Sequence, residues 1–187
     1  HWYVFQRAFF GGHHKRHALK TLSYVLPNGM IPAVYGPVSC RRNERLIINW
    51  SNVDDSLINL NREVLNIVNP RDWYRAYYDD GIARTFYPCH RSRHQAPLTL
   101  RQFQENERMK AMRITVEWSY TQVKALWAVA DNHKNKFKLE TDHHLIFAQI
   151  RLAHLFSNCV TCRRGNQTST YFGLDAPSLD QYLSMVP

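Results

Sequence analysis

Two acidic side chains, Asp79 and Glu117, occupy positions where they could together hold a divalent cation. Asp79 follows the aromatic stretch 73–78, which is expected to form a strand, and Gly81 then supplies a turn. Glu117 lies in a stretch with helical periodicity. An acid at a strand end and an acid on the following helix can converge, and hard divalent cations take oxygen ligands. The same residues also fit a turn-capping Asp79 and a solvated Glu117, so spacing alone leaves both interpretations open.

The helix that would carry Glu117 is predicted from Glu105 to about Ala128. Its apolar side chains recur at three- and four-residue steps: Met109, Met112, Val116, Tyr120, Val123 and Trp127. Glu117 directly follows Val116, which places it about 100° around the helix from this stripe. We therefore expect Glu117 at the margin of the apolar face.

The rest of the chain supplies a hairpin, a helix and a strand before that helix. Two runs of β-forming residues, 18–26 and 30–38, flank the turn sequence Pro27-Asn28-Gly29 and predict a β-hairpin. Ser51 or Asn52 is expected to cap a helix that ends at Asn69-Pro70. The apolar face expected for that helix consists of Val53, Leu57, Leu60, Val64, Leu65 and Val68.

A second long helix is predicted from Leu139 to about Asn158, apolar on most sides near its middle and hence packed in a core. Residues 163–187 are expected to form a strap that ends in a helical turn. With 187 residues, one domain covering 1–187 is the expectation.

The charge of the chain points to a polyanionic partner, with nucleic acid the first candidate. The formal net charge is +9 and the sequence pI is near 9.6. Candidate phosphate contacts are Lys15, Arg16, His17, Arg41 and Arg42. A further basic connection, 84–104, carries Arg84, His90, Arg91, Arg93, His94 and Arg101. A basic surface without a partner is the alternative.

The four cysteines are irregularly spaced in a chain too large to need disulfides, which favours reduced thiols in an intracellular compartment. Cys159 and Cys162 have zinc-ligand spacing and could be completed by His154, or by Cys89, His90 and His94. Two partly buried thiols at a helix end are the alternative. No apolar run of about 18 residues is present, so no membrane partner is expected. P-loop, GxSxG and GxGxxG motifs are absent.

Taken together, several motifs resemble those of Harbinger-type DDE endonucleases, a family of transposases and their domesticated relatives. The segment 12–20, GHHKRHALK, resembles their NGHKRxHALK, and 36–44, GPVSCRRNE, resembles GPVxGRRHD. The segment 77–82, YYDDGI, is similar to YGDSGY, and 113–118, RITVEW, is similar to RVTVEW. Residues 155–159 and the tail from Tyr171 to Leu183 also resemble the family, so the match runs along nearly the whole chain in order.

The resemblance implies a ribonuclease-H-like α/β fold, a mixed sheet flanked by helices. It implies metal-dependent cleavage of DNA phosphodiesters, or strand transfer, with two Mg²⁺ or Mn²⁺ ions. Asp79 and Glu117 would be catalytic residues and metal ligands. DNA would be the partner, with a separate DNA-binding subunit or a homo-oligomer as further possibilities, and the location would be nuclear or cytoplasmic.

The family's first catalytic Asp lies in a strand upstream of the NGHKR segment, whereas no Asp precedes Asp54 here. The chain is therefore expected to be truncated at its N-terminus, to lack the first strand, and to cut DNA poorly or not at all by itself. The alternative function is a domesticated module that binds DNA or protein without cutting, which zinc at Cys159 and Cys162 could stabilise.

Overall fold

The computed structural model describes residues 9–11, 15–64, 66, 68–69, 89, 97–131 and 143–185. The chain divides into two compact units, the first formed by His1–Arg42 with Thr115–Pro187 and the second by Asn43–Ile114. The architecture is α/β, mostly helical, with two-stranded antiparallel sheets. The expected strand that ends at Asp79 lies outside the described residues, and the expectation of a single domain over 1–187 stays a prediction.

The first unit is built on a β-ribbon formed by β3 (Leu19–Ser23) and β4 (Val34–Ser39). The strands are antiparallel, with Leu19 opposite Ser39 and Ser23 opposite Val34. Beyond them the pairing continues toward the turn, since the Leu26 amide donates to the Met30 carbonyl at 2.9 Å. The predicted hairpin around Pro27-Asn28-Gly29 is confirmed, although its regular strands are shorter than expected.

Two features shape this ribbon. Gly29 has φ +81° in the turn, a conformation that glycine adopts without steric cost. Gly36 has φ +99°, and a Cβ atom there would lie 2.7 Å from the Lys20 carbonyl oxygen. The register shifts opposite this point, between Lys20 and Leu22, so a β-bulge accompanies the glycine.

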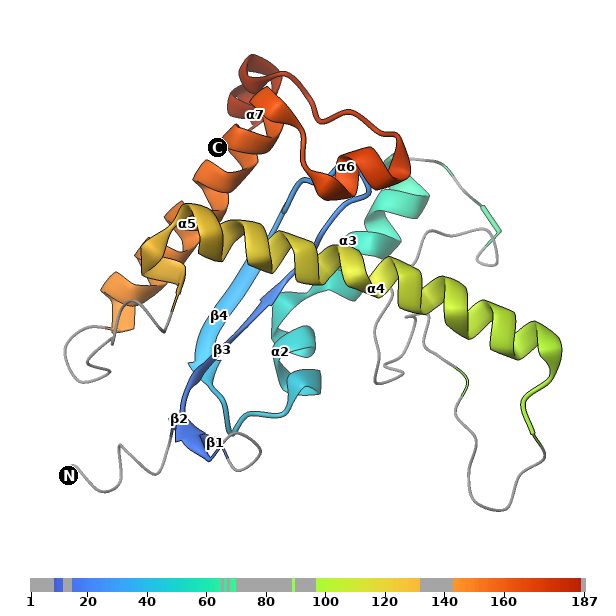
Figure 1. The fold of residues 1–187 in the computed structure, drawn as a ribbon, viewed down its shortest axis with the longest axis horizontal. Helices are drawn as coiled ribbons and strands as arrows, with labels where there is room; N and C mark the ends of the chain where they lie inside the picture. The colour runs from blue at the N-terminus through green and yellow to red at the C-terminus, as the bar shows by residue number, and fades with distance from the viewer. Residues whose placement is uncertain are drawn as a thin grey trace. The chain divides into compact units, whose positions relative to one another are not determined.

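Helices pack on the ribbon within the first unit (Figure 1). They are the second half of α4 (Leu100–Leu126), the 3₁₀ turn η2 (Ala128–Ala130), α5 (His143–Arg164), α6 (Gln167–Phe172) and α7 (Leu179–Met185). The core joins Ile31, Val123 and Ala153. Both predicted long helices are confirmed; α4 begins before Glu105, and α5 continues past Asn158. The C-terminal strap contains two short helices rather than a single turn.

The buried face of α4 differs from the predicted apolar stripe. Its buried residues are Thr115, Ser119 and Val123, whereas Met112, which belonged to the predicted stripe, is exposed. Glu117 therefore stands about 160° around the helix from the centre of the buried line rather than at its margin. Two small polar residues replace apolar ones on the buried face, and periodicity of apolar residues cannot detect such a face.

The buried face of α5 is also largely polar, because His154, Ser157, Asn158 and Thr161 accompany Ile146 and Ala153. Among the described residues, the segment Leu145–Arg164 is long and apolar enough to cross a membrane by length and composition alone. The same helix packs against β4, η2 and α7 of its own unit, and a core helix of a globular protein passes the same test. The absence of a membrane partner stays a prediction.

The second unit contains a run of short helices where the sequence predicted one helix. These are α2 (Glu44–Ser51), α3 (Val53–Asn59) and the π-helical turn η1 (Leu60–Val64). A helix does start directly after Asn52, as predicted, since α3 begins at Val53; the sequence did not predict α2, which precedes it from Glu44. Asn52 has φ +53° and separates the first two helices. Val68, placed on the buried face by its spacing, is 86% exposed.

Candidate nucleic-acid interface

The two basic segments singled out in the sequence meet at one end of the β-ribbon. A small hairpin, β1 (Phe10–Gly11) with β2 (Arg16–His17), pairs Gly11 with Arg16 and Phe10 with His17. The strand direction then carries the chain through Ala18 into β3, so Lys15–His17 lie at the start of the ribbon. Because β4 runs antiparallel to β3, its end at Ser39 returns to the same place and delivers Arg41 and Arg42 there.

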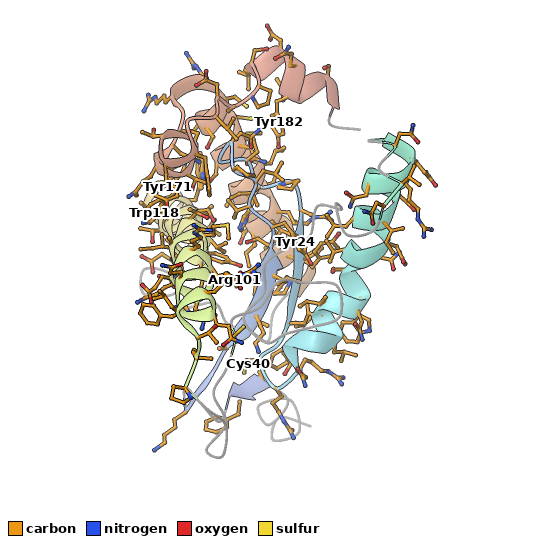
Figure 2. The ribbon with its side chains drawn as sticks, turned by 90° about the vertical axis from the view of Figure 1, so that its right-hand side faces the viewer. Tyr24, Cys40, Arg101, Trp118, Tyr171 and Tyr182 are labelled. Atoms are coloured by element: carbon orange, nitrogen blue, oxygen red, sulfur yellow. The ribbon has the colours of Figure 1, made fainter. Side chains whose placement is uncertain are left out.

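Hydrogen bonds join the chain segments around Phe9, Ala18 and Cys40. The Ala18 amide donates to the Phe9 carbonyl at 3.0 Å, and the Cys40 amide donates to the Ala18 carbonyl at 3.3 Å. The Cys40 thiol reaches the same Phe9 carbonyl, with Sγ and the oxygen 2.9 Å apart. Figure 2 shows Cys40 at this end of the ribbon. The segments that carry the basic residues are therefore held side by side although they are far apart in sequence.

A tight turn orients the second basic segment. The Arg42 amide donates to the Ser39 carbonyl at 2.9 Å, and the Arg41 amide lies 3.3 Å from the Ser39 hydroxyl. Lys20 Nζ approaches the Arg42 carbonyl at 3.5 Å. Lys15, Arg41 and Arg42 are all exposed. We call the set Lys15, Arg16, His17, Arg41 and Arg42 the basic ribbon end.

The sequence around this cluster is rich in cations, and no Asp or Glu precedes Glu44. All five members of the basic ribbon end belong to the first unit. The exposed cations Lys15, Arg41 and Arg42, on backbone segments brought together by the strand register, produce a positive potential over a short length of surface. Such a surface suits the phosphates of a nucleic acid backbone, which arginine and lysine bind through charge-assisted hydrogen bonds.

The opposite end of the ribbon is held by asparagines that the sequence did not single out. Asn158 on α5 accepts from the Ile31 amide and donates to the Ile31 carbonyl, each at 2.9 Å. Its amide also donates to the Tyr182 hydroxyl on α7 at 2.9 Å. Asn166 donates to the Gly29 carbonyl at 2.9 Å and caps α6 by accepting from the Ser169 amide. These contacts fix the ribbon on the helices.

Aromatic packing joins α4 to α6 beside this network. The Trp118 and Tyr171 rings meet edge to face with centroids 5.6 Å apart (Figure 2). Thr168 of α6 lies with its hydroxyl 3.4 Å from the Thr115 carbonyl of α4. Two of the segments that resemble the endonuclease family, around Glu117 and around Tyr171, are therefore in direct contact.

The two predicted catalytic acids are placed differently by the structure. Glu117 is an exposed residue of α4, and Asp79 lies outside the described residues. Within the described residues, no three His, Cys, Asp or Glu side chains form a group that could hold a metal ion. The acids required for a two-metal centre are thus not brought together by the described part of the chain, and their convergence stays a prediction.

The predicted zinc ligands are only partly assembled. The four cysteines are free thiols, and Cys159 and Cys162 lie one helical turn apart on α5. His154 is on the same helix, but its Nδ1 lies 2.8 Å from the Ile150 carbonyl. Burial lowers the pKa of His154, and its buried Nε2 has no hydrogen-bond partner among the residues that the structure describes. His90 and His94 lie outside the described residues.

The basic connection 84–104 is described only at Cys89 and from residue 97 onward. Cys89 exchanges two hydrogen bonds with the Asn106 side chain, at 2.8 and 2.9 Å. Arg101 is the one predicted basic residue of this stretch that is described, and it forms an ion pair with Glu105 at 3.0 Å on α4. The other basic residues of the connection lie outside the described residues.

Comparisons with known proteins found no matching family model, no matching curated protein and no matching solved structure.

Proposed function

We propose that this chain binds nucleic acid through the basic ribbon end. The observation that carries the proposal is the antiparallel register of β3 and β4, which delivers Arg41 and Arg42 to the segment that contains Lys15. A single short basic segment could reflect the composition of the chain alone. A fold that gathers two separated basic segments onto one exposed surface, with no acid before Glu44, favours a polyanionic ligand.

The chemistry of the surface favours contacts to the phosphate backbone over reading of base edges. Lysine and arginine on a ribbon end and its flanking turn can reach phosphates of a duplex, and such contacts carry no sequence information. Binding of this kind releases counterions and weakens steeply as salt rises. We therefore expect affinity for duplex DNA with little sequence preference.

The binding test compares two variants with the same change in net charge. Lys15→Ala/Arg41→Ala/Arg42→Ala removes three cations from the basic ribbon end. Arg108→Ala/Arg163→Ala/Arg164→Ala removes three exposed cations elsewhere on α4 and α5. Anisotropy titrations of a labelled duplex at low salt should show at least a tenfold loss of affinity for the first variant and a much smaller loss for the second. Equal losses would mean that net charge, and not this surface, governs binding.

We further propose that the surface belongs to a Harbinger-type DDE endonuclease domain with a ribonuclease-H-like fold. Support comes from the motifs similar to those of DDE endonucleases, which follow the same order along the chain. The order of a β-hairpin followed by helices is also compatible with a ribonuclease-H-like fold. The β-ribbon would hold the duplex while Asp79 and Glu117 bind Mg²⁺ or Mn²⁺. The metal ions, when bound, would activate the attacking water or 3′-hydroxyl and stabilise the leaving oxygen. Glu117 is exposed and so accessible to an ion.

A non-catalytic DNA- or protein-binding module is the second candidate. It requires only the basic ribbon end, in which Lys15, Arg41 and Arg42 are exposed. It shares the basic ribbon end with the endonuclease, so DNA binding supports both candidates and cleavage separates them. An intracellular location, nuclear or cytoplasmic, and a partner subunit or homo-oligomer are proposed for either.

A further inference from the structure

Two sulfur atoms meet where the ribbon turn packs against α5, and a third sulfur-bearing residue lies one helical turn away on α5. The Cys162 Sγ atom lies 3.8 Å from the Sδ atom of Met30, which follows the turn. Cys159 precedes Cys162 by three residues on α5, and residues at this spacing are neighbours on a helix surface. Met30 is 5% exposed, whereas both cysteines are half-buried. We call Met30, Cys159 and Cys162 the sulfur cluster.

The spacing of the two sulfurs suits a shared metal ion. Sulfur ligands sit about 2.3 Å from an ion such as zinc, so two of them at tetrahedral or trigonal angles are separated by about 3.8–4.0 Å. Cys162 and Met30 already have this separation.

The donor set distinguishes among metals. A structural zinc site takes four ligands from Cys, His, Asp or Glu, and the described part of the chain groups no three of these. Two thiols and a thioether are instead soft donors, which select Cu(I). A monovalent ion with two thiolates also leaves only one net negative charge to bury beside Met30. We propose that the sulfur cluster binds Cu(I) in a three-sulfur site.

Binding there would act on the fold as well as on the ion. Met30 belongs to the connection between β3 and β4, and the cysteines belong to α5, so the ion would cross-link the ribbon turn to that helix. Asn158 makes the same link through Ile31 in the absence of an ion. An ion that binds only the folded chain raises its stability by mass action.

The proposed test is an anaerobic titration of the full chain with Cu(I) against a chromogenic Cu(I) chelator. Wild type should compete for one equivalent. Met30→Leu, which keeps side-chain volume, should weaken binding at least tenfold, and Cys159→Ser or Cys162→Ser should abolish it. Cys40→Ser/Cys89→Ser removes the two other thiols and should bind like wild type. X-ray absorption should report copper bound by sulfur alone.

Affinity should also rise with pH, because each thiol loses its proton when it binds the metal. Circular dichroism of every variant, recorded without metal, separates loss of a ligand from loss of the fold. Failure of wild type to compete with the chelator would overturn the proposal. Met30→Leu binding as tightly as wild type would overturn it too, as would tighter binding of Zn²⁺ with no dependence on Met30. None of these outcomes depends on DNA binding.

Discussion

Replacing Asn158 by Ala should destabilise the first unit more than any surface substitution on the same helix. The Asn158 side chain satisfies both backbone groups of Ile31, and it donates to the Tyr182 hydroxyl. Asn158 is 3% exposed and Ile31 is 6% exposed. Water therefore cannot readily replace the lost partners, and alanine would leave a buried amide and a buried carbonyl unpaired.

The magnitude follows from those contacts. Each buried backbone group left without a partner costs about 1–3 kcal/mol, and the bond to Tyr182 adds about 0.5–1.5 kcal/mol. Summed, these contacts predict that Asn158→Ala lowers the free energy of unfolding by about 2.5–7.5 kcal/mol, a large share of the 5–15 kcal/mol typical of a domain. Tyr182→Phe removes only one of the three bonds and should cost about 1 kcal/mol.

Urea denaturation gives the stability of each variant, and hydrogen exchange at the Ile31 amide reports the local contact. Arg163→Ala, at an exposed position of α5, is the matched control and should change stability by less than about 0.5 kcal/mol. Asn158→Asp keeps an acceptor for the Ile31 amide but not a donor for its carbonyl, and should also destabilise. A loss below about 1 kcal/mol for Asn158→Ala, with an unchanged Ile31 exchange rate, would refute this reasoning.

Three further predictions follow from single residues. Gly29→Ala should lower the free energy of unfolding by about 2–4 kcal/mol, because φ is +81° and the new Cβ would meet the Asn166 side chain. Gly173→Ala, at φ +63° with no atom near its Cβ, should lower it by only about 1 kcal/mol in the same urea denaturation assay. Burial lowers the pKa of His154 in the folded chain below the usual value of 6.5, so below pH 6.5 the unfolded chain takes up a proton that the folded chain does not. The free energy of unfolding should therefore fall as pH drops through 6.5, and His154→Gln should lack this part of the pH dependence. Supercoiled plasmid incubated with Mn²⁺ should be nicked poorly or not at all by this chain, because residues 1–53 contain no Asp that could act as the first catalytic acid of the proposed endonuclease. Robust nicking that disappears in Asp79→Ala would contradict this and support the endonuclease.

The features that local chemistry determines were predictable from the sequence. The Pro27-Asn28-Gly29 turn between two β-forming runs predicted the hairpin, since this turn needs the positive φ that Gly29 supplies. Both long helices followed from the spacing of their apolar residues. The basic segments were also identified, but only the strand register places them on one surface, and composition cannot supply a register.

Burial of polar residues was the part that could not be predicted. Thr115 and Ser119 lie on the buried face of α4. Asn158 is buried on α5, where its side-chain amide hydrogen-bonds to the backbone of Ile31, a residue distant in sequence. Patterns of apolar residues carry no signal for such partners. The sequence indicates a helix that starts after Asn52, as α3 does, but not the helix α2 before it. Asn52 separates the two helices in the left-handed conformation that asparagine tolerates.

The salt dependence of DNA binding tests the central proposal most directly. For duplex DNA, log K falls with log salt by about 0.9 for each phosphate that a protein neutralises. If Lys15, Arg41 and Arg42 each contact a phosphate, Lys15→Ala/Arg41→Ala/Arg42→Ala should reduce the slope by about 2.7, while the charge-matched variant at positions 108, 163 and 164 should leave it nearly unchanged. An unchanged slope in the first variant, or equal reductions in the two, would contradict binding through the basic ribbon end.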